Sequence, residues 1–220
     1  VCVKRAAGRL FCVCFRRIDT RDRTRCVNDV RRNMNWKKDY EAKRTSAAEA
    51  VKLVRSGDRV YAGTASSVAY GLLAALWDRR HELENVEIQS SQAFEPSPIF
   101  DETADNPFHY LTYFIGVGER KVYRGGLPVN FTSVHLSQVN IWSKETAKPD
   151  VAFFEVSAPD EDGYFSYGAS GVACGEEIKK TARTVILQIN REVPYVLGGH
   201  HLIHVSGADA LVEIDRPLNR

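Results

Sequence analysis

Cysteine and methionine are scarce in most of this 220-residue sequence, and long apolar runs are missing. After residue 33 the chain has one cysteine, Cys174, which excludes a disulfide framework for the main fold and favours a reducing cytosol. A transmembrane helix needs about 20 predominantly apolar residues in succession, and no run reaches that length. The net charge of +2 gives no sign of nucleic-acid or membrane binding. We therefore expect a cytoplasmic protein without nucleic-acid or membrane partners.

The first 33 residues differ in composition from the rest of the chain. They contain ten basic residues, three acidic residues and four of the five cysteines, and Met34, the only methionine, follows them directly. We predict that residues 1–33 are a basic, cysteine-containing segment outside the fold and that residues 34–220 form one domain. A mitochondrial transit peptide and a basic arm that contacts nucleic acid are minority alternatives for the segment.

Residues 34–220 alternate between short β-favouring runs and helical patterns. This alternation is typical of βαβ units and predicts an α/β fold with an open, mostly parallel sheet and flanking helices. We predict helices from a cap at Thr45 or Ser46 to Gly57, over 69–80 and over 171–182, an irregular stretch at 94–110, and a turn at 116–118. The predicted strands are 59–62, 86–88, 111–115, 130–135, 151–154 and 184–189, with strand-like pieces at 204–206 and 211–214.

A loop rich in proline, aspartate and glycine, residues 156–168, follows the predicted strand 151–154. Loops at the carboxyl ends of strands hold the ligands of open α/β sheets, so this loop is a candidate binding segment. Pro159 fixes its own φ, and Gly163 and Gly168 permit positive φ, so the loop is also typical of a rigid turn. The two interpretations are compatible, because a rigid loop can shape a binding site.

A second candidate loop, Gly63-Thr64-Ala65-Ser66, lies between a predicted strand and a predicted helix. Backbone N–H groups and hydroxyls at such a position can face the acyl end of a substrate. The alternative is an ordinary turn in which Ser66 or Ser67 caps the following helix. The dinucleotide-binding pattern Gly-x-Gly-x-x-Gly is absent.

Metal binding and cysteine catalysis receive little support. His200, His201 and His204 have no accompanying cysteine or carboxylate cluster. On a helix, His200 and His204 would share one face, but His204 falls in a strand-like piece, so this spacing does not indicate a metal site. Cys12 and Cys14 are one residue apart, without a second pair at zinc-site spacing. Cys174 has no evident histidine partner and is more typical of packing in a helix. We expect no metal.

Seven segments occur in order along the chain: residues 34–40, 56–60, 116–120, 131–137, 157–164, 203–206 and 213–218. Together they resemble the amino-terminal half of the acetyl-CoA hydrolase/CoA-transferase family, in particular 4-hydroxybutyrate CoA-transferases. Residues 157–164 resemble the family's Ser-Pro-Pro-Asp-x-x-Gly-Tyr loop, with Ala158 in place of the first proline. Ser133, Gln138 and Asn140 replace a Pro, a Glu and a Pro that are common in the family, departures that concern substrate preference and activity rather than fold.

The resemblance implies a domain of the CoA-transferase amino-terminal type that works with an acyl-CoA, a short-chain carboxylate and a carboxyl-terminal CoA-transferase domain, in a homo-oligomer. Coenzyme A is then a substrate. The family's catalytic glutamate would lie beyond Arg220 and form a glutamyl-CoA intermediate, so this chain alone is expected to be inactive. Acetyl-CoA hydrolysis and a non-catalytic, truncated binding module are the alternatives. The expected substrate-binding residues are Gly63, Thr64, Ala65, Ser66, Pro159, Asp160, Gly163 and Tyr164.

Overall fold

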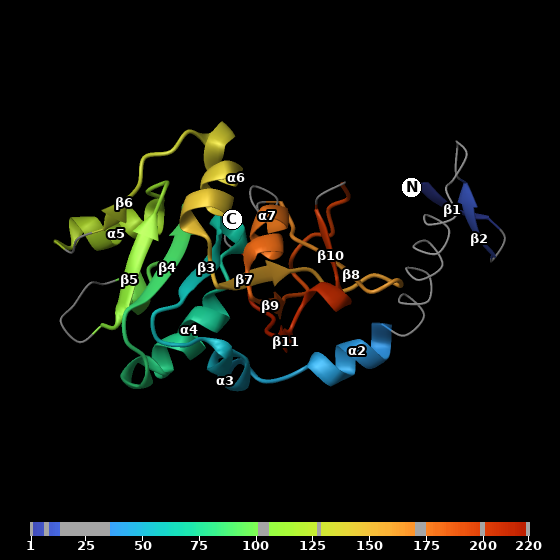
Figure 1. The fold of residues 1–220 in the computed structure, drawn as a ribbon, viewed down its shortest axis with the longest axis horizontal. Coiled ribbons are helices and arrows are strands. Elements are labelled where there is room, and N and C mark those ends of the chain that lie inside the picture. Colours follow the sequence, from blue (N-terminus) through green and yellow to red (C-terminus); the bar gives the residue numbers. More distant parts are fainter. Residues whose placement is uncertain are drawn as a thin grey trace. The chain divides into compact units, whose positions relative to one another are not determined.

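The computed structural model describes residues 2–6, 9–13, 36–100, 106–126, 129–169, 175–198 and 201–218 (Figure 1). The chain divides into two compact units, Val1–Trp36 and Lys37–Arg220. In the first unit, β1 (Cys2–Ala6) and β2 (Arg9–Val13) form an antiparallel pair, which the sequence analysis did not predict. That residues 1–33 stand outside the α/β domain stays a prediction.

A seven-stranded parallel sheet forms the second unit, with the strand order β11-β9-β7-β3-β4-β5-β6. The chain runs from β3 outward through β4 and β5 to β6, then returns to β7 on the other side of β3. This confirms the predicted α/β fold and places a topological switch point between β3 and β7. The strands are β3 (Arg59–Thr64), β4 (Val86–Ser91), β5 (Phe108–Thr112), β6 (Asn130–Phe131), β7 (Val151–Val156), β9 (Thr184–Ile189) and β11 (Ala210–Glu213).

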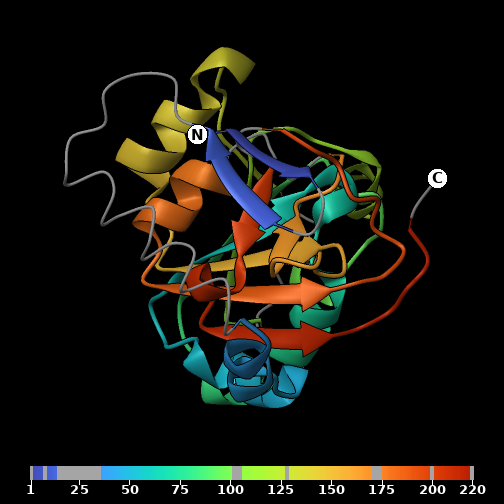
Figure 2. The same ribbon diagram turned by 90° about the vertical axis from the view of Figure 1, so that its right-hand side faces the viewer.

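Helices cover both faces of the sheet, α3 and α4 on one side and α6 and α7 on the other (Figures 1 and 2). Among the described residues, no helix is long and apolar enough to cross a membrane. Apart from Trp36, which belongs to the first unit, the described helices of this unit are α2 (Trp36–Lys43), α3 (Ala47–Ala50), α4 (Tyr70–Asp78), α5 (Val117–Arg124), α6 (Val139–Trp142) and α7 (Gly175–Thr181).

The core follows the two-residue alternation of the strands. Val60, Ile88 and Phe153 are fully buried in one apolar cluster with Leu72 and Leu76 of α4. Because successive strand side chains point to opposite faces, the intervening residues face α6 and α7. There the rings of Tyr61, Phe154 and Tyr167 pack together, with centroid separations of 5.6 Å for Tyr61–Phe154 and 5.0 Å for Phe154–Tyr167.

Several predicted boundaries are wrong. Strand β5 begins at Phe108, inside the stretch predicted to be irregular, and β6 has two residues instead of six. The strand near 204–206 is β10 (Leu202–His204), which pairs antiparallel with β8 (Tyr164–Ser166), a strand that was not predicted. Val205–Gly207 is a 3-10 turn instead, because β10 ends where its partner strand begins.

Two helices also depart from the predictions. Helix α5 occupies the predicted turn at 116–118, and the Glu119 carboxylate accepts the Gly116 N–H at 2.9 Å, which closes its first turn. Ser46 caps α3 as predicted, accepting the Glu49 N–H at 3.2 Å, but the helix continues as a 3-10 turn, Val51–Leu53. The described part of the predicted helix 171–182 contains α7, whereas Cys174 lies outside the described residues.

Candidate functional site

The carboxyl end of β3 contains an irregularity that positions Thr64. The pairing of β3 with β4 shifts register between Tyr61 and Thr64, as in a β-bulge. Gly63 has φ +94°, and a Cβ built on it would lie 2.1 Å from the Ser67 carbonyl oxygen, so only glycine fits. The extra residue brings the Thr64 hydroxyl to the Tyr61 hydroxyl, at 3.1 Å.

Four hydroxyls meet around Thr64, and we call Tyr61, Thr64, Ser91 and Tyr113 the hydroxyl cluster. The Thr64 Oγ1 lies 2.9 Å from the Tyr113 hydroxyl and 3.4 Å from the Ser91 Oγ. The four residues come from β3, from the last residue of β4 and from just beyond β5, so they gather at the carboxyl edge beside the switch point, where open α/β sheets bind ligands. Each hydroxyl can donate or accept, so a carbonyl or carboxylate oxygen is a suitable partner.

The sequence predicted Thr64 but not the other three members of the hydroxyl cluster. Tyr61 lies within a strand, and its proximity to Thr64 depends on the bulge. Ser91 belongs to the polar run 89–92 directly after the apolar part of β4, a signal that points to a strand end. Tyr113 was assigned to the middle of a strand that in fact ends at Thr112.

The rest of the Gly63–Ser66 loop is strained, and the next residue, Ser67, is hydrogen-bonded to the segment after β8. Ala65 is buried with φ +53°, an unfavourable conformation for a residue with a Cβ. Ser66 is half-buried, and the Ser67 hydroxyl donates to the Tyr167 carbonyl at 3.2 Å. Neither serine caps α4: its N-cap is Ala69, without a side-chain cap bond. The Gln188 Oε1 accepts the Leu72 N–H at 3.0 Å instead.

Pro159, Asp160, Gly163 and Tyr164 form a tight turn. The Asp160 carboxylate accepts the N–H groups of Asp162 and Tyr164 at 3.0 and 2.8 Å, and the Tyr195 hydroxyl at 2.7 Å. Burial and this carboxylate raise the pKa of Tyr195. Gly163 has φ +83°, as the rigid-turn interpretation requires. Tyr167, rather than this turn, makes the hydrogen bond to the loop after β3.

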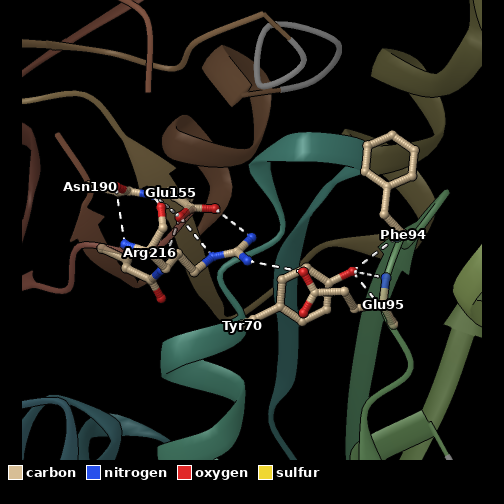
Figure 3. Close-up of polar contacts among 7 residues, drawn as sticks. Tyr70, Phe94, Glu95, Glu155, Asn190 and Arg216 are labelled. Carbon is tan, nitrogen blue, oxygen red and sulfur yellow. Dashed lines mark hydrogen bonds and ion pairs between the residues drawn. The ribbon is translucent and has the colours of Figure 1, made fainter. Parts of the chain in front are cut away.

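A second polar group at the same edge was not predicted from the sequence (Figure 3). Glu155 is fully buried near the end of β7, and its carboxylate accepts from Arg216 Nε at 3.0 Å and Arg216 Nη2 at 3.3 Å. Asn190 Nδ2 and Gln188 Nε2 donate to the same carboxylate at 2.8 and 3.2 Å. The sequence signal for this polar group was a glutamate inside an otherwise apolar strand, residues 151–156.

Arg216 extends this group toward β4 and α4. Its Nη1 lies 3.3 Å from Glu95 Oε1, and its guanidinium lies 4.7 Å from the Tyr70 ring centroid (Figure 3). The Tyr70 hydroxyl accepts the N–H groups of Phe94 and Glu95 at 3.0 and 2.9 Å. Burial raises the pKa of Tyr70 to about 12. We call Tyr70, Glu95, Glu155, Asn190 and Arg216 the arginine network.

The described residues do not form a metal centre: no three His, Cys, Asp or Glu side chains within them are arranged to hold an ion. His204 lies on strand β10, and its Nδ1 is 2.9 Å from the Ser206 Oγ. The metal-binding spacing of two histidines on one helix face therefore does not apply to it. His200 itself lies outside the described residues.

Residues 27–217 match the acetyl-CoA hydrolase/transferase N-terminal domain. The chain belongs to this family. The match starts seven residues before Met34, earlier than the resemblance found in the sequence. It confirms the resemblance itself, which identified this family from short segments.

Relatives in the family are CoA-transferases. The butyryl-CoA:acetate CoA-transferase of Anaerostipes caccae is 32% identical over 188 residues, which are 84% of this chain and 42% of the relative. The 4-hydroxybutyrate coenzyme A transferase of Clostridium kluyveri is 30% identical over 186 residues, 84% of this chain and 43% of the relative. The chain therefore spans about two fifths of the length of these relatives.

Solved structures agree with the fold. RipA from Yersinia pestis superposes with a TM-score of 0.71 and 28% identity, over 83% of this chain and 44% of RipA. A 4-hydroxybutyrate CoA-transferase from Porphyromonas gingivalis gives a TM-score of 0.61 and 25% identity, over 84% of this chain and 42% of that protein.

Proposed function

We propose that this chain is the amino-terminal domain of an enzyme that moves CoA between an acyl-CoA and a short-chain carboxylate. The observation that supports it is the hydroxyl cluster at the switch point, in a family whose relatives are named as CoA-transferases. Hydroxyl groups can donate to the oxygen of an acyl or carboxylate group, so the cluster fits such a ligand. Acetate, butyrate and 4-hydroxybutyrate are all compatible with this chemistry.

The proposed reaction uses a glutamate that a carboxyl-terminal domain supplies. Its carboxylate attacks the thioester carbonyl, CoA thiolate leaves, and an acyl-glutamyl anhydride forms. The thiolate then attacks the glutamyl carbonyl of the anhydride, which releases the first carboxylate and leaves a glutamyl-CoA thioester. The second carboxylate reverses these steps. In this scheme the hydroxyl cluster donates hydrogen bonds to the oxygen that becomes negative when the carbonyl is attacked.

The two predicted groups of site residues take different parts in this proposal. Thr64 contributes its hydroxyl, and Gly63 and Ala65 hold the backbone that places it. Ser66, half-buried beside Thr64, lines the same loop. The turn that contains Pro159, Asp160, Gly163 and Tyr164 shapes the wall of the site rather than binding directly, because the Asp160 carboxylate is already occupied by three donors.

We also propose that the carboxyl-terminal domain covers the exposed apolar residues beside the hydroxyl cluster. Phe114, next to Tyr113, is 52% exposed, and Ile141, next to Trp142, is 56% exposed. The centroids of the Tyr113 and Trp142 rings are 5.6 Å apart, so the sequence neighbours of both exposed residues meet at the cluster. Removing such side chains from water is favourable by roughly 1.5–3 kcal/mol per fully buried side chain, which would favour docking.

Two measurements on the purified chain test the proposal. Butyryl-CoA with labelled acetate should give no transfer, because the nucleophile is absent; robust transfer by residues 1–220 contradicts the proposed division of labour. Ligand-observed NMR with butyrate should show binding that Thr64→Val removes, since valine keeps the shape and deletes the hydroxyl. Thr181→Val is the matched control, because the Thr181 hydroxyl bonds only within the region of α7. Equal butyrate binding by both variants would show that the Thr64 hydroxyl does not contact butyrate.

A further inference from the structure

The segment after β11 is bound to the sheet. The Ile214 N–H donates to the Ile189 carbonyl at 2.9 Å, which extends the pairing of β11 with β9 by one residue. Asn190 then holds the next turn of the segment: its Nδ2 donates to the Arg216 carbonyl at 2.9 Å, and its Oδ1 accepts the Arg216 N–H at 3.4 Å. Residues 214–218 therefore lie along the carboxyl edge and belong to the domain.

Arg216 then joins four segments at this edge of the sheet, three through its side chain and one through its backbone. It reaches Glu155 of β7, lies over Tyr70 at the start of the helix that follows β3, and contacts Glu95 in the loop after β4, while Asn190 holds its backbone at the end of β9 (Figure 3). The side chain is 15% exposed, so most of the guanidinium is enclosed. Arg216 thus contacts β7, the residue after β9, the first residue of α4 and the loop after β4.

The two carboxylates on Arg216 have different environments. Glu155 is fully buried and receives both Nε and Nη2, whereas the Glu95 side chain is 43% exposed and receives Nη1 alone. A buried carboxylate that loses its cation is strongly unfavourable, while an exposed ion pair contributes little. Glu155 therefore fixes Arg216, and Glu95 with Tyr70 transmits its position to the loop after β4.

That loop begins beside the hydroxyl cluster. Ser91 is the last residue of β4, and three and four residues later the Phe94 and Glu95 N–H groups donate to the Tyr70 hydroxyl beneath Arg216. The family match ends at residue 217, directly after Arg216, and the relatives are more than twice as long as the matched part. In the proposed enzyme, the carboxyl-terminal domain would start from this point.

We propose that Arg216 is a positioning residue that holds the exit of the domain at the carboxyl edge and couples it to the loop 92–95 next to the hydroxyl cluster. A following domain would then begin beside the site, and its movement would reach that loop through Arg216 and Tyr70. The purpose of this coupling rests on the proposed function, but its existence can be tested without substrate.

Hydrogen exchange of backbone amides in the 220-residue chain tests the coupling. Arg216→Met should speed exchange of residues 214–218 and of Phe94 and Glu95 by about tenfold or more beyond any change in the β9 amides, which report global unfolding. Arg191→Met is the matched control: it deletes the exposed Arg191–Asp215 pair on the same segment, at 3.3 Å, and should leave 94–95 unchanged.

A double variant separates coupling from stability. Arg216→Met with Glu155→Gln no longer buries an unpaired charge, so global stability should recover while residues 94–95 still exchange fast. If Arg216→Met loosens only 214–218, or if all amides including β9 speed up equally and the double variant restores them all, Arg216 is a stability element and the coupling is refuted. Loss of butyrate binding is not part of this readout, so either proposal can fail without the other.

Discussion

Replacement of Gly63 by alanine is the sharpest test of how the β3 bulge forms. A Cβ at this position would lie 2.1 Å from the Ser67 carbonyl oxygen and 2.8 Å from the Ser67 carbonyl carbon. Both are backbone atoms, which cannot move without opening the turn. Gly57 is a matched comparison, because it also has a positive φ, +81°, but no atom lies within 4 Å of its added Cβ.

The two variants share one cost and differ in the other. A left-handed conformation costs a residue with a Cβ about 1–2 kcal/mol. Gly57→Ala and Gly63→Ala should therefore each lower the free energy of unfolding by this amount. Overpacking against a rigid neighbour adds about 1–3 kcal/mol at Gly63 only. We therefore expect a loss of about 2–5 kcal/mol for Gly63→Ala.

Urea unfolding followed by tryptophan fluorescence measures both losses on the same protein. The slope m should stay unchanged, so that midpoints compare directly. Gly63→Ala should also abolish the effect of Thr64→Val on butyrate binding, because the displaced hydroxyl no longer contributes. Equal losses of stability for the two glycine variants would refute the close approach of Ser67 and, with it, the placement of Thr64.

Three further predictions concern the edge of the sheet. Arg216→Met should cost about 3–5 kcal/mol in urea unfolding because it leaves Glu155 buried without its cation, and Glu155→Gln in the same chain should recover most of that loss. Gly71→Ala should destabilise the protein in thermal unfolding, although alanine normally favours a helix by about 1 kcal/mol, because its Cβ would lie 2.6 Å from the Ile214 Cδ1 and 2.9 Å from the Gln188 Oε1. Burial lowers the pKa of His204 in the folded state, so the unfolded chain takes up this proton first as pH falls below about 6.5. The free energy of unfolding should therefore decrease as pH decreases in that range, and His204→Gln should flatten this pH dependence. An unchanged slope of unfolding free energy against pH would contradict the role of His204.

The fold could be predicted from sequence because burial dominates its pattern. Strands β7 and β9 are buried at every position, and such continuous apolar runs are typical of parallel strands covered on both faces. Both residues of the short edge strand β6 are exposed, and the predicted strand was four residues too long. Periodicity carries little information where only two residues pair, so the edge of the sheet was the least predictable part.

The site could be predicted only in part because its contacts depend on strand ends. Thr64 follows from its place after a strand, but the meeting of Thr64 with Tyr61 requires a register shift that alternation does not record. The partners of Asp160 lie within its own turn and at Tyr195, so the acidic loop that the sequence emphasises is mostly occupied by its own structure.

Backbone strain distinguishes the two candidate loops. Ala65 after β3 and Gln92 after β4 both have φ +53° without being glycine, and both flank the hydroxyl cluster. Such conformations cost of order 1–3 kcal/mol and persist where surrounding contacts enforce them, often at functional sites. In the Pro159–Tyr164 turn the positive φ falls on Gly163, where it costs nothing. The strained residues therefore favour the Thr64 end of the switch point over the acidic turn as the binding site of the proposed function.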